Sequence, residues 1–401
     1  MKTVVRLNLI VVFFISLFPL IGKSQWLPSN NGLTDTVVYA LEYNHSKTKV
    51  FAGTLGSGVF TSIDNGATWQ SSNAGITNDS IVSMAYNDSL FFVGTHSGLF
   101  KSNDDGSTWQ LVNQLPQGLT ILSICINGSD IFIGTDGNGV FYSPDLGSSW
   151  NTVNSGLSQT ALNVTSIVAV GNILMIGTIY DGVYKSVNNG LSWFSANSGL
   201  GCTTYMRSFL SFGNKIFVGT QGCGIYSSSD FGNTWTSSNS GLTNLTVIKM
   251  IASGNEIYAA TFGGGVNFSS DSGNTWSAKN SGLNMNNDLA VNTITTNGSD
   301  FLIGTFGSGA FRWQTINTTN NTYDFSDNKI KVFPNPSTQK INFNSESKII
   351  YADLVDGKGL VSRFYFDVNE LDISSLPNGK YNIIFYGVQN KIIDKQQLIK
   401  Q

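Results

Sequence analysis

The sequence predicts an all-β protein, in which a seven-bladed β-propeller closed by its N-terminal strand is followed by an immunoglobulin-like β-sandwich. Three observations support this prediction. Trp recurs at positions 69, 109, 150, 193, 235 and 276, so a unit of 40 to 43 residues repeats. Only 12 % of the residues are charged while 43 of 401 are Gly, a composition typical of short strands joined by tight polar turns. The repeat ends by residue 316, and a Lys-rich segment follows.

Each of the six repeated Trp residues closes a motif that we call the box, of the form Ser-x-Asp-x-Gly-x-Thr-Trp. The copy from Ser62 to Trp69 is complete, whereas Asn188 replaces Asp in the fourth copy. We expect the box to be the hairpin between the third and fourth strands of a blade, with Asp accepting backbone N–H bonds and Trp buried between blades. A structural role is therefore predicted for Asp64, Trp69, Asp104, Trp109, Asp145, Trp150, Asn188, Trp193, Asp230, Trp235, Asp271 and Trp276.

A second repeated signal precedes each box and shows how the ring should close. It is an apolar run that ends in Gly-Thr, or Ala-Thr in one copy, and it occurs seven times against six boxes. The segment at Trp26 has the pattern of a fourth strand but no strands of its own before it. We expect this strand to complete the seventh blade, which removes an exposed sheet edge. An open β-solenoid would not require the two counts to complement each other in this way.

The first residues have the pattern of a targeting segment. Lys2 and Arg6 precede an apolar run from Leu9 to Ile21, and small residues up to Ser24 follow. We interpret residues 1–24 as a secretory signal peptide, the alternative being a buried N-terminal helix. No later run has 18 consecutive apolar residues, so no membrane span is expected.

The last part of the chain differs from the repeat in composition. Residues 317–328 form a polar linker, and residues 329–401 contain ten of the 22 basic residues. Strand-like runs in this segment are separated by turns such as Pro334-Asn335-Pro336 and Pro377-Asn378-Gly379, which predicts a small β-sandwich. The chain is thus divided into a signal peptide, a propeller over residues 25–316, a linker and a sandwich.

Both parts resemble known families. The boxes resemble the Asp-box (BNR) repeats of sialidases, sortilin-type receptors and xyloglucan-degrading propellers, a motif specific for the fold and not for one activity. The segment from Val332 to Ser337, the segment from Leu371 to Tyr381 and the end at Lys400 resemble the type A C-terminal sorting domain of the type IX secretion system, found in secreted Bacteroidota proteins. Lys380 departs from that pattern. The resemblance implies the secretion machinery as a partner and a secreted or cell-surface location; the alternative is a carbohydrate-binding sandwich.

Binding residues are expected on the propeller face opposite the boxes, which we call the rim face. Loops between the second and third strands, and between blades, should meet there around the channel mouth, and their aromatic, acidic and amide side chains suit a glycan or protein ligand. The alternative is a Gly-rich rim without a specific partner. Cys202 and Cys223 lie on this face and could form a disulfide, whereas Cys125 belongs to the core. The predicted binding residues are Asp35, Asp79, His96, Asp136, Tyr180, Asp181, Tyr205, Phe262 and Phe306.

Several functions are excluded or disfavoured. The net charge of −3 gives no basic surface for nucleic acid. A sialidase needs three arginines, and the propeller has only Arg207 and Arg312. His45 and His96 lack a nucleophile motif. The remaining enzyme alternative is a xyloglucanase-type glycosidase that uses a pair of rim aspartates, with Asp288 as a further candidate. We expect a non-catalytic monomer without metal or cofactor.

Overall fold

The computed structural model describes residues 24–315 and 330–401, except residues 45, 88–89, 285–286, 338, 346–348, 350, 357–360, 366–369 and 387–391. The predicted signal peptide up to residue 23, the linker and His45 lie outside the described residues. The chain forms two compact units, one of which spans Gln25–Gln314 while the other contains Thr315–Gln401. Within the described part, no helix has the length and apolar character needed to cross a membrane.

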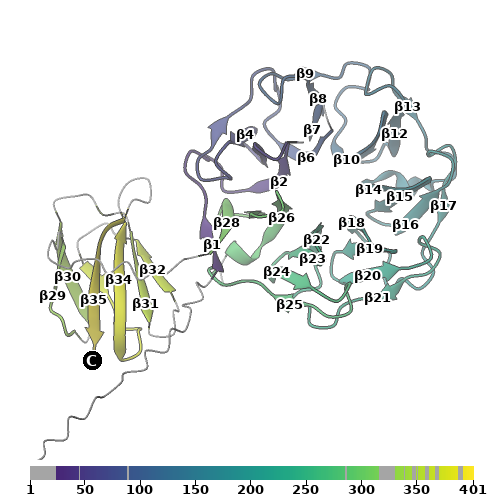
Figure 1. Cartoon of the computed structure of the whole chain (residues 1–401). Helices are drawn as coiled ribbons and strands as arrows, with labels where there is room; N and C mark the ends of the chain where they lie inside the picture. Colours follow the sequence, from purple (N-terminus) through teal and green to yellow (C-terminus); the bar gives the residue numbers. More distant parts are fainter. Residues whose placement is uncertain are drawn as a thin grey trace, which may run out of the picture. The chain divides into compact units, whose positions relative to one another are not determined.

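The described part of the first unit forms seven four-stranded antiparallel sheets arranged in a ring (Figure 1). We number them as blades 1 to 7 in chain order. The inner strands are β2 (Val38–Tyr43), β6 (Ile81–Tyr86), β10 (Ile121–Asn127), β14 (Val164–Val170), β18 (Met206–Phe212), β22 (Val247–Ser253) and β26 (Val291–Thr296). The second strands are β3 (Val50–Thr54), β7 (Phe91–Thr95), β11 (Asp130–Thr135), β15 (Ile173–Thr178), β19 (Lys215–Thr220), β23 (Glu256–Thr261) and β27 (Phe301–Thr305).

The third and fourth strands flank the boxes. The third strands are β4 (Val59–Ser62), β8 (Gly98–Ser102), β12 (Val140–Ser143), β16 (Val183–Ser186), β20 (Ile225–Ser228), β24 (Gly265–Ser269) and β28 (Ala310–Thr315). The outer strands are β5 (Gln70–Ser71), β9 (Gln110–Leu111), β13 (Asn151–Thr152), β17 (Phe194–Ser195), β21 (Thr236–Ser237), β25 (Ser277–Ala278) and β1 (Ser24–Pro28). Two short 3₁₀ helices, η1 (Gln159–Leu162) and η2 (Asn287–Leu289), lie in connections between blades.

The apolar runs become second strands because both faces of each blade are covered by neighbouring blades. Every residue of Phe91–Thr95, for example, is buried, which explains why these strands are continuously apolar and not alternating. The core lies between the blades: Phe132 of blade 3 packs with Leu174 and Trp193 of blade 4 in one cluster. Each inner strand has a bulge near its start, as between Met206 and Ser208, and the residue at the bulge leaves the regular pairing.

The N-terminal strand closes the ring, as the sequence predicts. The seventh sheet has the order β1-β28-β27-β26, so the first described strand pairs with the last strand of the propeller. Trp26 is 1 % exposed, its backbone N–H donates to Ser281 O at 2.8 Å, and its ring lies 5.2 Å from the ring of Trp313. The chain ends of the propeller are thereby held by hydrogen bonds and by a buried side chain, which confirms the predicted closure.

The C-terminal unit is a two-sheet β-sandwich. One sheet has the order β29 (Ile330–Phe333), β30 (Lys340–Ser345), β33 (Glu370–Asp372), and the other has the order β32 (Val361–Tyr365), β31 (Tyr351–Asp356), β34 (Gly379–Tyr386), β35 (Ile392–Lys400). Apolar side chains from both sheets share one core, in which the rings of Phe343 and Phe385 lie 5.1 Å apart. This arrangement matches the predicted all-β fold.

Candidate functional site

The box aspartates use their carboxylate oxygens inside their own turns. Asp64 Oδ1 accepts from Thr68 N at 2.8 Å and from Ser62 Oγ at 2.7 Å, while Oδ2 accepts from Thr68 Oγ1 at 2.6 Å. Gly66 has a φ of 79°, which Gly adopts without strain. In the second box the hydrogen bonds from Thr108 lower the pKa of Asp104 to about 2. These bonds hold the hairpin and engage both carboxylate oxygens within the turn.

The fourth box keeps the same geometry without a charge. Asn188 Oδ1 accepts from Ser192 N and from Ser186 Oγ, each at 2.9 Å, and Nδ2 donates to Ser192 Oγ at 3.0 Å. The amide therefore replaces the carboxylate bond for bond. A turn that works equally well with an amide needs the oxygen as an acceptor and does not need the negative charge.

The box tryptophans join neighbouring blades. The indole N–H of Trp193 donates to Val153 O of the preceding blade at 2.7 Å, and its backbone N–H donates to Ser155 O at 2.9 Å. Gly156 allows this contact, because a Cβ at that position would lie 2.2 Å from Trp193 O. The same indole-to-backbone bond to the preceding blade is made by Trp69, Trp109, Trp235 and Trp276.

Trp150 departs from the predicted burial between blades. It is only partly buried, and its indole N–H donates to Gly147 O of its own turn at 3.2 Å. The reason lies in blade 2. There, Leu115 occupies the position that corresponds to Gly75 of blade 1. A Cβ at Gly75 would lie 2.0 Å from Trp109 O. A Leu at this position therefore cannot make the close contact that Gly makes at the other junctions between blades. Trp150 still packs against the cluster that blades 2 and 3 share, so it keeps a place between blades but not the full burial and the indole bond of the other box tryptophans.

Three of the candidate rim aspartates hold their own loops. Asp35 accepts from Val37 N at 2.9 Å and from Gly56 N at 2.8 Å. Asp181 accepts from Ser158 Oγ and from Tyr184 OH, and the bond from Ser158 is the main cause that lowers its pKa. Asp288 is 8 % exposed and accepts from Asn284 N at 3.0 Å. Their carboxylates serve as turn and loop acceptors.

The other predicted polar rim residues lie at the surface of the rim loops. Asp79, His96 and Asp136 are exposed, and the structure gives the carboxylates of Asp79 and Asp136 no hydrogen-bond partner among the described residues. Within the same residues, no group of three His, Cys, Asp or Glu side chains could hold a metal ion.

A row of aromatic rings lies on the rim face. Phe262 and Phe306 are 40 % and 42 % exposed, and their ring centroids are 5.8 Å apart. Phe306 in turn lies 6.5 Å from the ring of Tyr39. We call these three residues the aromatic strip. Tyr180 is also exposed on the rim. The sequence predicts Phe262 and Phe306 as binding residues but not Tyr39, whose only signal is its place at the bulge of the inner strand, between Val38 and Ala40.

Arg207 is the second residue of the site that is not among the predicted binding residues. It lies at the bulge of β18, and its guanidinium carbon is 3.6 Å from the ring centroid of Tyr205. Its Nη2 donates to Gln221 Oε1 at 2.6 Å, while its Nε is buried without an acceptor. Burial lowers the pKa of Arg207. The mouth therefore holds an oriented cation beside aromatic rings.

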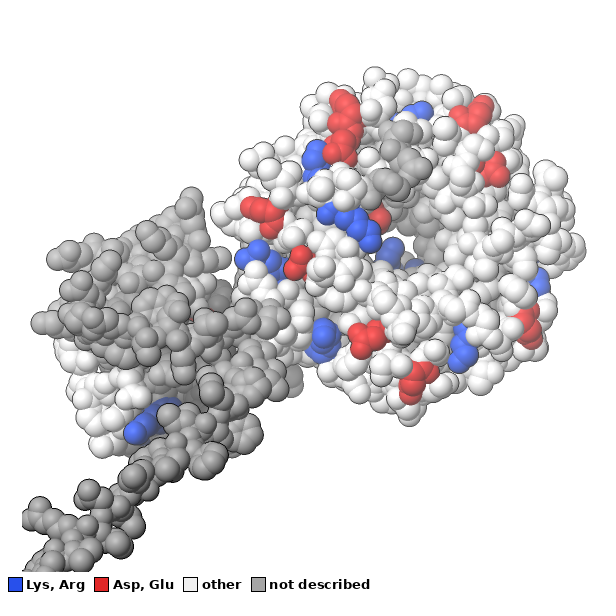
Figure 2. Space-filling model, in the orientation of Figure 1, with Lys and Arg blue, Asp and Glu red and all other residues white. Residues whose placement is uncertain are grey.

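One face of the ring is hollowed at its centre, and Figure 2 shows basic groups beside this opening, with further acidic and basic groups spread over the face. Glu42 of β2 has its pKa raised by burial, and the charge of Lys249 on β22 opposes this rise. These two opposite charges come from inner strands of different blades.

The cysteines follow two patterns. Cys202 and Cys223 form a disulfide across a sequence separation of 21, with their Cα atoms 6.5 Å apart. It ties the start of blade 5 to the loop that also contains Gln221. Cys125 is a free thiol in the described part of the chain, and burial raises its pKa to about 11, which makes it unreactive.

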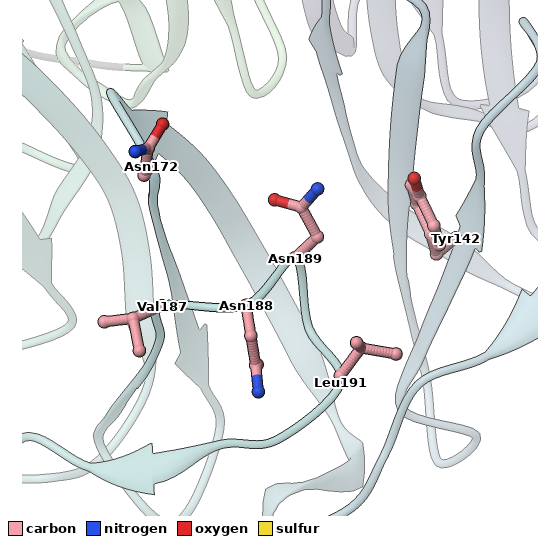
Figure 3. A pocket seen from close by; sticks show the side chains of 6 residues that line it. All are labelled: Tyr142, Asn172, Val187, Asn188, Asn189 and Leu191. Atoms are coloured by element: carbon pink, nitrogen blue, oxygen red, sulfur yellow. The ribbon is translucent and has the colours of Figure 1, made fainter.

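A shallow pocket lies on the box face, away from the predicted site. It has a volume of about 480 Å³ and lies between β12 and the box of blade 4 (Figure 3). Val187 and Leu191 are 61 % and 66 % exposed. The amides around them come from a hairpin turn and from the box itself. The pocket is lined by Tyr142, Asn172, Val187, Asn188, Asn189 and Leu191.

Comparisons with known proteins support the propeller fold. The family model of the DUF6242 β-propeller domain matches residues 167–296. No curated protein matches the chain. Among solved structures, the chain is similar to the extracellular domain of a hybrid two-component system from B. thetaiotaomicron, with 16 % identity and a TM-score of 0.60 over 95 % of this chain and 55 % of that one.

Two further structures come from surface and enzyme proteins. PorZ, a surface component of the type-IX secretion system of Porphyromonas gingivalis, shares 15 % identity with a TM-score of 0.53 over 92 % of this chain and 60 % of that one. An ancestral GH74 enzyme shares 17 % identity with a TM-score of 0.56 over 94 % of this chain and 63 % of that one. The chain thus spans less than two thirds of each of these three structures. At these identities the likeness shows the β-propeller fold alone.

Proposed function

We propose that this chain is a secreted or cell-surface β-propeller that binds a glycan or protein ligand at the rim face without catalysis. The single observation that carries this proposal is the aromatic strip beside Arg207. Exposed aromatic rings next to an oriented polar group are typical of ligand sites. The rim carboxylates of Asp35, Asp181 and Asp288 support it as well, because they are engaged in their own loops.

A glycan and protein array tests the binding function. The array would be probed with the purified chain and with a Phe306→Ala variant, because Phe306 is the central ring of the strip. Phe194→Ala is the matched control, since Phe194 is 61 % exposed but lies on the outer strand β17. Binding that Phe306→Ala weakens and Phe194→Ala leaves unchanged supports the proposal. Binding that is equally insensitive to both variants contradicts it.

A glycosidase that uses rim aspartates is the second candidate function. It is favoured by one observation, that the carboxylates of Asp79 and Asp136 are exposed and free of partners among the described residues. Release of reducing sugar from xyloglucan and related polymers would be measured for the parent and for Asp79→Asn and Asp136→Asn. Activity that either variant abolishes would establish this function and overturn the non-catalytic proposal. Glycan binding without sugar release supports the binding module.

We further propose that export uses both ends of the chain. Residues 1–24 act as the signal peptide, the Asp-box propeller is the cargo, and residues 329–401 act as the type IX sorting domain. The similarity of the propeller to PorZ is compatible with a cell-surface setting but concerns the fold alone. Deleting residues 329–401 should leave the propeller in the periplasm, as measured by cell fractionation against the full-length chain. Normal export of the truncated chain would overturn this assignment.

A further inference from the structure

Among the residues that the structure describes, none supplies a counter-ion to Arg207. Its guanidinium stacks on Tyr205 at 3.6 Å and donates to Gln221 at 2.6 Å. The structure pairs no carboxylate with it among the described residues, although aspartates are present in the neighbouring rim loops. Stacking and a hydrogen bond to a neutral amide fix the direction of the guanidinium group. They do not neutralise its charge.

The position of this charge is energetically costly in the absence of a ligand. Arg207 is half-buried, and its Nε has no acceptor. A cation removed from water is stable only when hydrogen bonds and opposite charge compensate the lost solvation. An Arg fork matches the two oxygens of a carboxylate, which is the group that would supply both. The unpaired guanidinium therefore indicates an anionic ligand group.

The aromatic strip and this cation belong to the same mouth. Arg207 and Tyr39 lie at corresponding bulges near the starts of the inner strands of blades 5 and 1, and the charge of Arg207 opposes the rise that burial causes in the pKa of Tyr39. From Tyr39 the rings of Phe306 and Phe262 extend over blades 7 and 6. The mouth thus offers one carboxylate-binding group followed by a row of rings.

We propose that the channel mouth binds an acidic oligosaccharide, with the carboxylate of a uronic acid on Arg207 and the sugar rings against the aromatic strip. This inference rests on the proposed binding function and names its ligand class. A row of rings suits a row of pyranose C–H faces. A peptide chain would bring backbone N–H groups that require acceptors, and the side chains of the strip supply only the hydroxyl of Tyr39.

Calorimetric titration with defined trimers tests the proposal. The probes are trimers of galacturonic acid and of mannuronic acid, with the methyl ester of the galacturonic acid trimer as the matched neutral ligand. At least one acidic trimer should bind at least about 10-fold more tightly than the ester, because charge-assisted bonds are stronger than neutral ones. Arg207→Gln should remove this preference, while Arg207→Lys should retain part of it.

The control variant removes a charge from the same blade at the opposite end. Lys215→Gln changes the net charge equally, but Lys215 starts β19 and donates to Ser272 O in the box of blade 6. It should leave the affinity for the acidic trimers unchanged. Raising the salt concentration should weaken binding of the acidic trimer and not that of the ester. A melting temperature within about 2 °C of the parent, a shift of roughly 1 kcal/mol in a unit of this size, shows that each variant is folded.

Each remaining outcome decides between the inference and the function on which it rests. If neither acidic trimer binds, or if Arg207→Gln binds them as tightly as the parent, the inference is wrong. Binding of a peptide with a free C-terminal carboxylate, lost on amidation, while the trimers do not bind, would also overturn it in favour of a protein ligand. If neutral glycans bind through Phe306 and Arg207→Gln does not change their affinity, the inference is wrong and the proposed function stands. If no ligand binds at the rim face, both are wrong.

Discussion

Replacing Trp193 by Ala should destabilise the propeller far more than the same change at Trp150. Trp193 is 2 % exposed and its indole N–H bonds to the preceding blade at 2.7 Å. Truncating a buried Trp costs about 3–5 kcal/mol, and the unpaired Val153 carbonyl adds roughly 1 kcal/mol. Trp150 is partly buried and bonds only within its own turn, so we expect a loss of about 2 kcal/mol, roughly half of the burial term.

Differential scanning calorimetry of the purified chain measures both losses. A unit of this size shifts its melting temperature by about 2 °C per kcal/mol, so the two variants should differ by roughly 5 °C. Trp193→Phe separates the two contributions, because it keeps an aromatic ring and removes the N–H donor; it should cost about 1–2 kcal/mol. Equal losses at Trp193 and Trp150 would refute the conclusion that Trp150 contributes less than Trp193 to the packing between blades.

Three further predictions concern the box and the disulfide. Asp64→Ala should lower the free energy of unfolding by about 1 kcal/mol, as loss of a capping bond does, and leave ligand binding intact; unchanged melting with lost binding would contradict the structural role. Breaking the disulfide with Cys202→Ser should cost about 3 kcal/mol from loop closure, seen as a lower melting temperature that added reductant does not change further. Acid should destabilise the propeller between about pH 4 and pH 2, because several box aspartates have a folded-state pKa below the ordinary value of about 3.9. Such a group contributes stability that is present above the ordinary pKa and is lost as the pH falls towards the folded-state pKa. A denaturant midpoint that stays constant from about pH 5 to about pH 2 would argue against this prediction. The aspartates whose pKa is lowered to about 2 are Asp104, Asp145, Asp230 and Asp271.

The propeller could be predicted from the sequence because its repeated units are local. A box closes a hairpin within eight residues, as from Ser62 to Trp69, and all of its hydrogen bonds to Asp64 come from that segment. The orphan strand at Trp26 could be assigned for the same reason, because its pattern was that of a missing fourth strand. Local turn chemistry and an apolar run of fixed length therefore define each blade, and their number defines the ring.

The rim loops place Phe262, Phe306 and Tyr205 among the predicted binding residues, whereas Arg207 and Tyr39 could not be predicted in this way. Arg207, Tyr39 and Phe306 lie far apart in the sequence and belong to three different blades, so only closure of the ring brings them to one mouth. The nearby sequence does not distinguish a residue at an inner-strand bulge from its neighbours. The rim aspartates show the opposite case, in which residues predicted from sequence are used elsewhere. Asp35 and Asp181 look like site residues in sequence, yet nearby backbone and hydroxyl donors satisfy them.

The strands, the turns and the closure of the ring were thus encoded in short segments of the chain. The partners of each exposed side chain, and the departure of Trp150, were decided by contacts between blades. The physical reason is range: a turn is stabilised by bonds within a few residues, whereas a binding surface depends on which distant side chains face each other once the ring is closed.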